Sequence, residues 1–170
     1  MLCITPYSPL NSPVLQTTFI GEHSVTKATL FGDSVSSFDD DENAPDYNWI
    51  EIDPDYGGNG SEIDLYDNGN NGDDVTTINL PFTFTFYGIS YDEVSVCSNG
   101  WISFGQTDME SFRNYTLPGP GGPSPMVAVF WDDLKTTSGG EVYSYHNQVD
   151  DSFIIEWSNL RTYLSNSSES

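Results

Sequence analysis

One segment restricts the fold of this chain more than any other, because apolar and polar side chains alternate strictly along it. Between residues 78 and 86 the apolar positions are Ile78, Leu80, Phe82, Phe84 and Phe86, while Asn79, Thr83 and Thr85 fall between them. A period of two is the period of a β-strand, whose successive side chains point to opposite faces of the sheet. The segment therefore predicts a strand that covers a hydrophobic core with one face.

Other short apolar segments, bounded by Gly, Pro, Asn or Asp, repeat this β-type pattern. Phe153, Ile155 and Trp157 alternate, whereas residues 126–131 are continuously apolar, as is typical of a central strand buried on both faces. The predicted strands are 47–52, 62–66, 77–87, 93–97, 101–104, 126–131, 141–146 and 152–157. No segment has sustained helical periodicity, so we predict an all-β fold, an antiparallel β-sandwich of roughly eight strands.

The predicted core lies on the apolar faces of these strands. It comprises Phe82, Phe84, Phe86, Val94, Val96, Ile102, Phe104, Val127, Val129, Phe130, Ile155 and Trp157. Two tight turns, at Gly88-Ile89-Ser90 and at Ser98-Asn99-Gly100, would join consecutive strands, since Gly and Asn-Gly accept the positive φ angles of hairpin turns.

Charge restricts the classes of partner. The chain has 26 acidic and 4 basic residues and a formal net charge of -22, which repels nucleic-acid phosphates and anionic membrane surfaces. Aromatic residues make up 14% of the chain, a share that argues against acidic disorder. No apolar run approaches the ~20 residues that span a bilayer. We expect a secreted or cell-surface protein that binds no nucleic acid and does not insert into a membrane.

Composition divides the chain near residue 45. Residues 1–45 contain scattered apolar positions, several prolines and an acidic run, which are typical of a linker or the tail of a preceding module, although residues 25–31 have the pattern of one strand. We assign residues 46–170 to the sandwich domain.

The acidic loop between residues 53 and 74 is the leading candidate for a metal site. Carboxylates spaced by Gly and Asn offer the hard oxygen ligands that calcium prefers. The candidate ligands are Asp53, Asp55, Asp64, Asp67, Asp73 and Asp74. An EF-hand is rejected because the flanking segments have strand patterns and the last loop position lacks Glu. The alternative is a solvated acidic loop whose Asp, Asn and Gly residues serve turns.

Two further constellations bear on catalysis. Asp132-Asp133 with Glu156 would resemble the carboxylate pair of a glycoside hydrolase, although an Asp at a strand end commonly caps a turn. Cys97 with His146 or His23 would be needed for a thiol nucleophile, but a buried cysteine and a surface histidine explain these positions more simply. Cys3 and Cys97 are too few for a disulfide framework. We predict no catalytic residues in this chain.

Aromatic residues at loop positions form an alternative binding surface. Such rings stack on sugars or pack against peptides. The candidates are Trp49, Tyr56, Tyr66, Tyr87, Tyr91, Trp101 and Tyr115. Most would belong to the core of a sandwich, so a carbohydrate platform is the lesser interpretation.

Several runs together resemble a known family. These are Leu80-Pro81-Phe82-Thr83-Phe84-Thr85-Phe86-Tyr87-Gly88, then Cys97-Ser98-Asn99-Gly100-Trp101-Ile102-Ser103-Phe104-Gly105, then Phe130-Trp131-Asp132-Asp133-Leu134. In order and spacing, residues 47–157 resemble the nidogen-like (NIDO-type) extracellular domain of large secreted or surface bacterial proteins, some of which carry gingipain-type peptidase modules. Cys97 stands where a small residue is expected, and the family's further strands would follow Ser170, so we expect a truncated domain.

This resemblance implies a non-catalytic adhesion or scaffolding module of a larger extracellular protein. Its partners would be other extracellular proteins, glycans or neighbouring domains of the same chain. The alternatives are an accessory domain of a secreted peptidase or glycoside hydrolase, or a carbohydrate-binding sandwich. Likeness of fold does not choose among them.

Overall fold

The structure is a computed structural model of the chain. It describes residues 1–4, 15–21, 24–31, 34–37, 49–69, 72–113, 115 and 121–164, and between 15 and 37 it describes the backbone alone. The predicted fold class is confirmed, since these residues form antiparallel sheets of a β-sandwich and, among them, a single short 3-10 helix, η1 (Pro54–Tyr56).

Three sheets contain the described strands. The strands are β1 (Leu2–Ile4), β2 (Leu15–Gly21), β3 (Ser24–Phe31), β4 (Ser34–Ser37), β5 (Ser61–Glu62), β6 (Val75–Phe86), β7 (Ile89–Cys97), β8 (Trp101–Phe104), β9 (Met126–Ala128), β10 (Leu134–Lys135), β11 (Glu141–Asn147), β12 (Ser152–Ser158) and β13 (Arg161–Thr162). Within the described ranges, the strand orders are β4-β3-β2-β1-β12-β11-β5, β6-β7-β8-β9 and β10-β13.

The N-terminal residues contain more strand than their sequence predicts. We expected one strand, at residues 25–31, whereas the described residues of this segment form four, of which β3 coincides with it. β1 pairs antiparallel with β12, with Leu2 opposite Ile155, and on its other side it pairs with β2. Three-residue strands such as β1 carry too little periodicity to be read from sequence. The division of the chain near residue 45 stays a prediction.

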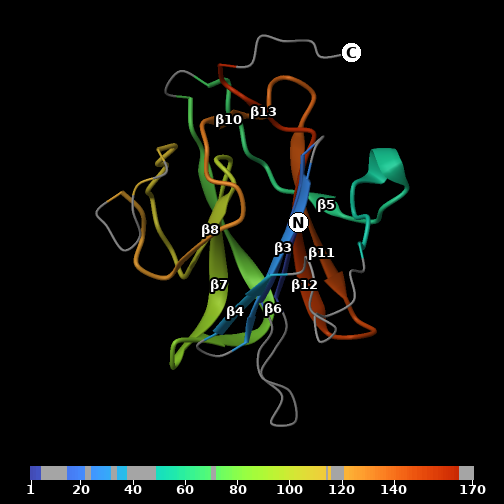
Figure 1. The fold of residues 1–170 in the computed structure, drawn as a ribbon, viewed down its shortest axis with the longest axis vertical. Helices are drawn as coiled ribbons and strands as arrows, with labels where there is room; N and C mark the ends of the chain where they lie inside the picture. Colours follow the sequence, from blue (N-terminus) through green and yellow to red (C-terminus); the bar gives the residue numbers. More distant parts are fainter. Residues whose placement is uncertain are drawn as a thin grey trace. The chain divides into compact units, whose positions relative to one another are not determined.

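β6 bears out the alternation that opened the sequence analysis. Leu80 and Phe84 are buried, while Asn79 and Thr83 are exposed. β6 and β7 form the long green hairpin of Figure 1. Its turn was predicted too late in the chain, because the two residues between the strands are Tyr87 and Gly88, both with positive φ.

The apolar run at 126–131 was wrongly predicted as a buried central strand. Only Met126–Ala128 are in strand β9, which lies at the edge of its sheet. The N–H groups of Val129 and Phe130 both donate to the carbonyl oxygen of Gly100, at 3.0 Å each, and so leave the ladder. Continuous apolarity shows that a segment is buried and does not show its backbone path.

The strand predicted at 47–52 is also wrong for its described residues, 49–52. The N–H of Ile52 donates to the Glu156 side chain, and the Ile52 carbonyl accepts from the N–H of Gly60, so this backbone bonds to a side chain and a turn. Ile52 is nevertheless buried, in a cluster with Met1 and Ile154. β5 is likewise shorter than the predicted 62–66.

The chain divides into two compact units. The first comprises residues 1–61, 80–92 and 143–156, and the second comprises 62–79, 93–142 and 157–170. Cys97, Trp101 and Trp131 form a buried cluster in the second unit. Of the predicted core, the residues that are only half-buried are Phe82, Phe86, Val129, Phe130 and Trp157.

Gly100 provides a test of this packing. It has φ +76°, and a Cβ placed on it would lie 1.9 Å from the Phe130 carbonyl oxygen. We expect Gly100→Ala to lower the free energy of unfolding by about 3 kcal/mol or more in urea titrations, since backbone strain and a backbone clash add. Gly139 has φ +87° with no atom within 4 Å of its Cβ position, so Gly139→Ala should cost only about 1 kcal/mol. Equal losses in the two variants would contradict the close packing.

Candidate functional site

Several hydrogen bonds join the turn between β7 and β8 to other segments of the second unit. Asn99, at its centre, is fully buried. Its Nδ2 donates to Asp73 Oδ1 at 2.8 Å and to the Glu110 carbonyl at 3.4 Å, and its Oδ1 accepts from the N–H of Leu134 at 2.9 Å. One amide side chain thus joins three segments that are distant in sequence.

Ser98, beside it, connects the turn to the acidic loop. Its Oγ donates to Asp67 Oδ2 at 2.6 Å and accepts from the N–H of Asp74 at 3.2 Å, while its own N–H donates to the Asp74 carbonyl at 3.0 Å. Asp67 also accepts from the N–H of Gly69 at 2.7 Å. The buried Asp67 carboxylate therefore fixes the loop on the turn.

A group of acidic side chains surrounds this turn, and we call it the carboxylate cluster. Its members are Asp67, Asp73, Asp74, Glu110 and Asp133. Burial, followed by repulsion from Asp73 and Asp74, raises the pKa of Asp67, although hydrogen bonds from Ser98 and Gly69 oppose the rise.

Two further members of the cluster are also perturbed. Desolvation and the charges of Asp74 and Asp73 raise the pKa of Glu110. The pKa of Asp133 is raised by desolvation and by Asp73, Asp67 and Asp132, against the opposing charge of Lys135. Asp133 Oδ1 is buried without a hydrogen-bond partner among the described residues. The cluster therefore holds more negative charge than its hydrogen bonds neutralise.

The predicted calcium ligands fall in different places. The structure gathers Asp67, Asp73 and Asp74, as the bonds above show, but Asp53 and Asp55 belong to the first unit, and Asp64 is exposed. Asp53 is the N-cap of η1, where its carboxylate accepts from the N–H of Asp55 at 2.9 Å. Among the described residues, no three His, Cys, Asp or Glu side chains are arranged to hold a metal ion together. Calcium binding stays a prediction.

Sequence reasoning missed Ser98, Asn99, Glu110 and Asp133 as neighbours of this loop. Ile63, Leu65 and Asp67 are buried, and the residues between them are exposed. This period-2 pattern places Asp67 on the inner face, so the sequence could have indicated its burial. No such signal exists for Glu110 or Asp133, which reach the loop through tertiary structure alone.

Glu156 forms a separate acidic site in the first unit. It is 4% exposed, and its Oε2 accepts from the N–H of Ile52 at 3.3 Å. Burial, followed by repulsion from Glu51, raises the pKa of Glu156 to about 7. Glu51 in turn accepts from the N–H of Asp53 at 2.8 Å and from the Trp49 indole N–H at 3.2 Å. These bonds hold segment 49–53 in place.

Cys97, the candidate thiol nucleophile, has surroundings that favour a structural role over a catalytic one. Cys97 is a fully buried free cysteine, and burial raises the pKa of its thiol to about 12, so the reactive thiolate does not form near neutral pH. His146 lies in the first unit and pairs with Asp151 at 3.0 Å, and His23 lies outside the described residues. The description of Cys97 as a buried cysteine is confirmed.

The aromatic candidates divide by burial. Trp101 is buried, and its indole N–H donates to the Ser111 carbonyl at 2.9 Å, where Trp131 donates as well, at 2.8 Å. Trp49 and Tyr91 are half-buried. The large aromatic side chains that remain exposed are Tyr56, Tyr66, Tyr87 and Tyr115. Trp101 is therefore a core residue, while these four tyrosines face solvent.

The raised pKa of Glu156 predicts a contribution to stability that increases on acidification. The folded state of Glu156 has a pKa of about 7 against 4.5 for the ordinary group, so between these values the folded chain binds the proton that the unfolded chain has lost. Glu156 should contribute a rise of roughly 2–3 kcal/mol in the free energy of unfolding as the pH falls from 8 towards 5, since one pKa unit corresponds to about 1.4 kcal/mol. The Met1 amino group acts in the opposite direction, because burial lowers its pKa from 8.0 to about 6, so the Glu156 contribution is the difference between the parent chain and a variant that lacks this carboxyl group. Urea titrations across this range measure the effect.

A matched pair of variants isolates Glu156. Glu156→Gln keeps an oxygen for the Ile52 N–H, so it should raise stability at pH 8, and this advantage over the parent chain should shrink as the pH falls towards 5. Glu93→Gln, at an exposed position of β7, should leave the dependence unchanged. A Glu156→Gln profile with the slope of the parent chain would refute the assignment.

A comparison with protein-family models supports the all-β domain described above. The family model described as NIDO-related matches residues 56–170, a span that includes the carboxylate cluster and strands β5 to β13. No curated protein and no solved structure matches the chain significantly. In the described part of the chain, no helix has the length and apolar character needed to cross a membrane. The family indicates an extracellular module of a larger protein. The match covers most of the chain, which therefore belongs to the NIDO-related (nidogen-related) family.

Proposed function

We propose that this chain is a non-catalytic adhesion module of an extracellular protein. The observation that supports the proposal is the use of its buried carboxylates. Asp53, Asp67 and Glu156 each accept hydrogen bonds from backbone N–H groups, and Asp67 accepts a further bond from Ser98. Carboxylates so engaged stabilise loops, whereas a general acid or base must reach a substrate.

The exposed apolar side chains support adhesion over passive scaffolding. Large apolar residues that face solvent favour contacts with another macromolecule, since they are otherwise a liability for a secreted protein. On the described surface they are Tyr56, Tyr66, Tyr87, Ile89, Tyr115, Val149 and Leu164. Tyr56 is the last residue of η1, and the others lie in turns, loops or strand ends, where contact residues commonly lie.

Adhesion can be tested with beads that carry the folded module. We expect these beads to be retained on at least one surface in a panel of immobilised extracellular proteins and glycans, under conditions in which beads carrying an unrelated protein of similar net charge are washed off. Mass spectrometry of the panel should detect no cleavage. Retention equal to that of the control beads, or cleavage of any panel member, would contradict the proposal.

We also propose that calcium stabilises the module at the carboxylate cluster. The support is electrostatic, because burial and then mutual repulsion raise the pKa values of Asp67, Glu110 and Asp133, and Asp133 Oδ1 has no partner among the described residues. A divalent cation would reduce this repulsion. Within the described part of the cluster, no three carboxylates are arranged to hold a metal ion together, so binding would require side chains to rearrange.

Thermal melts in chelator and in millimolar calcium test this proposal. Calcium should raise the melting midpoint, since a ligand of the native state stabilises it. The rise should disappear in Asp73→Asn/Asp133→Asn and persist in Asp53→Asn/Asp55→Asn, whose carboxylates lie in the first unit. No rise in the parent chain, or a rise lost only in the second variant, would exclude calcium binding at this cluster.

A further inference from the structure

Two of the few basic residues of this chain lie opposite each other. Strands β10 and β13 form a two-stranded antiparallel sheet in the second unit, and Figure 1 draws them side by side. Their register places Lys135 opposite Arg161. Residues directly opposite each other in an antiparallel pair point to the same face, with Cβ atoms about 5 Å apart. The two cations therefore share one face of the sheet.

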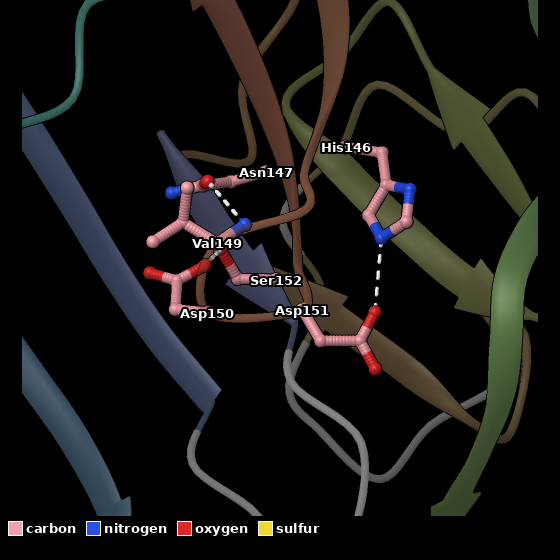
Figure 2. Close-up of polar contacts among 6 residues, drawn as sticks. All are labelled: His146, Asn147, Val149, Asp150, Asp151 and Ser152. Carbon is pink, nitrogen blue, oxygen red and sulfur yellow. Dashed lines mark hydrogen bonds and ion pairs between the residues drawn. The ribbon is translucent and has the colours of Figure 1, made fainter.

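This arrangement is unfavourable for the folded chain by itself, because like charges directly opposite each other destabilise a sheet. The chain has 4 basic and 26 acidic residues, so carboxylate partners are abundant. Among the described residues, however, neither Lys135 nor Arg161 forms an ion pair with a carboxylate. By contrast, His146 and Asp151 of the first unit do pair, at 3.0 Å (Figure 2). The cation pair is thus left with its positive charge unmatched at contact distance.

The other basic residues are placed differently. Arg113 lies over the ring of its neighbour Phe112, with 5.3 Å between the guanidinium carbon and the ring centroid. Lys27 lies in β3, where the structure describes the backbone alone. Two of the 4 basic residues are therefore gathered at one position of the β10–β13 sheet.

Solvent reaches this cation pair. Arg161 is exposed, and Lys135 is half-buried. A guanidinium group presents its N–H donors in a planar fork that binds a carboxylate or a sulfate through two parallel hydrogen bonds, and an ammonium group adds a compact positive charge. One anionic group can therefore contact both side chains.

An aromatic ring lies next to the pair. The N–H of Tyr163 donates to the Asp133 carbonyl at 2.7 Å, which continues the pairing of the two strands and puts Tyr163 on the same face as Arg161. Tyr163 is half-buried, and its ring lies close to Gly69, since a Cβ placed on this glycine would be 2.2 Å from the ring atom Cδ2. A ring held in this way can pack against a sugar.

Nearby carboxylates limit the charge that a ligand can carry. Asp133 lies two residues before Lys135 and so falls on the same face, where the lysine opposes the rise in the pKa of Asp133 that burial and other carboxylates cause. The chain as a whole has a net charge of -22. A polyanion would be repelled, whereas one negative charge on an otherwise uncharged molecule would meet the two cations at close range.

We infer that Lys135, Arg161 and Tyr163 form a binding site for a single acidic sugar residue of an extracellular glycan. Arg161 and Lys135 bind the carboxylate or sulfate of this sugar, and Tyr163 packs against its ring. The inference rests on the proposed adhesive role and names a ligand class for it.

NMR titrations of the isotope-labelled full chain test the site. The probes are methyl glucuronide, the sulfate ester of methyl glucoside, and uncharged methyl glucoside. At least one of the two acidic sugars should shift the signals of residues 134–136 and 161–163 and bind at least about tenfold more tightly than the uncharged sugar. The acidic sugar that binds more tightly identifies the anionic group. Binding of neither acidic sugar, or equal binding of charged and uncharged sugars, would overturn the inference.

Two further probes examine the sugar ring and the single charge. Acetate lacks the ring, and a hexasaccharide of heparin carries many negative charges. Both should bind at least several-fold more weakly than the better acidic sugar. Acetate that binds as tightly would show that the sugar is not recognised, and heparin that binds more tightly would show a site for polyanions. Either result contradicts the inference.

Charge-matched variants separate this site from the overall charge. Arg161→Gln and Arg113→Gln each remove one positive charge, but only the first should weaken binding of the acidic sugar, by at least about tenfold. Arg161→Lys keeps the charge and loses the fork, so it should weaken binding several-fold. Because Arg161 is exposed, both of its variants should melt within about 2 °C of the parent chain. Equal weakening by Arg161→Gln and Arg113→Gln would reduce the effect to net charge and refute the site.

The result can be told apart from that of the adhesion test. If beads adhere to the panel while no acidic sugar binds, the adhesive role stands and the acidic sugar is wrong. If an acidic sugar binds at this site while the beads are not retained, the site stands and the adhesive role fails. If neither occurs, both fail.

Discussion

The second unit depends on one buried amide, the side chain of Asn99. Its carbonyl and amino groups bond to Leu134, Asp73 and Glu110, so the β7–β8 turn, the acidic loop and the segment after β9 share one anchor. An amide suits this position because it both donates and accepts, which a carboxylate cannot do when ionised. Gly100 then lets the chain pass close beneath Phe130. A turn that sequence rules assign to the surface is in fact part of the interior.

That anchor explains how a chain of net charge -22 tolerates carboxylates in its interior. Asp67 is fully buried, yet a hydroxyl and a backbone N–H hold it, so its desolvation is largely offset. Asp133 Oδ1 lacks such a donor among the described residues. The difference marks Asp133 as the point where the cluster is least satisfied, and therefore where a proton or a cation would relieve the most repulsion.

Local pattern was enough to predict the fold class and the long hairpin, because side chains in β6 alternate with a period of two. The bounds of β8 were predicted because this strand directly follows the Asn-Gly turn. The local pattern failed where hydrogen bonds between distant segments determine the path of the backbone. Val129 and Phe130 leave the sheet because the Gly100 carbonyl takes both N–H groups, and Ile52 is buried without a strand because Glu156 binds its N–H. The acidic loop was recognised as a whole, but Glu110 and Asp133 join it from other segments, which spacing along one sequence does not reveal.

The same division between buried and exposed groups separates stability from recognition. Polar groups in the interior, such as Asn99 and Asp67, are already engaged, so substituting them changes the fold before it changes any contact with a partner. The residues at the hairpin tips have the opposite character. Tyr87 and Val149 are exposed and cover little of the core, and Tyr87 occupies an unfavourable backbone region. Side chains that folding does not require are those on which selection for a partner can act with least loss of stability.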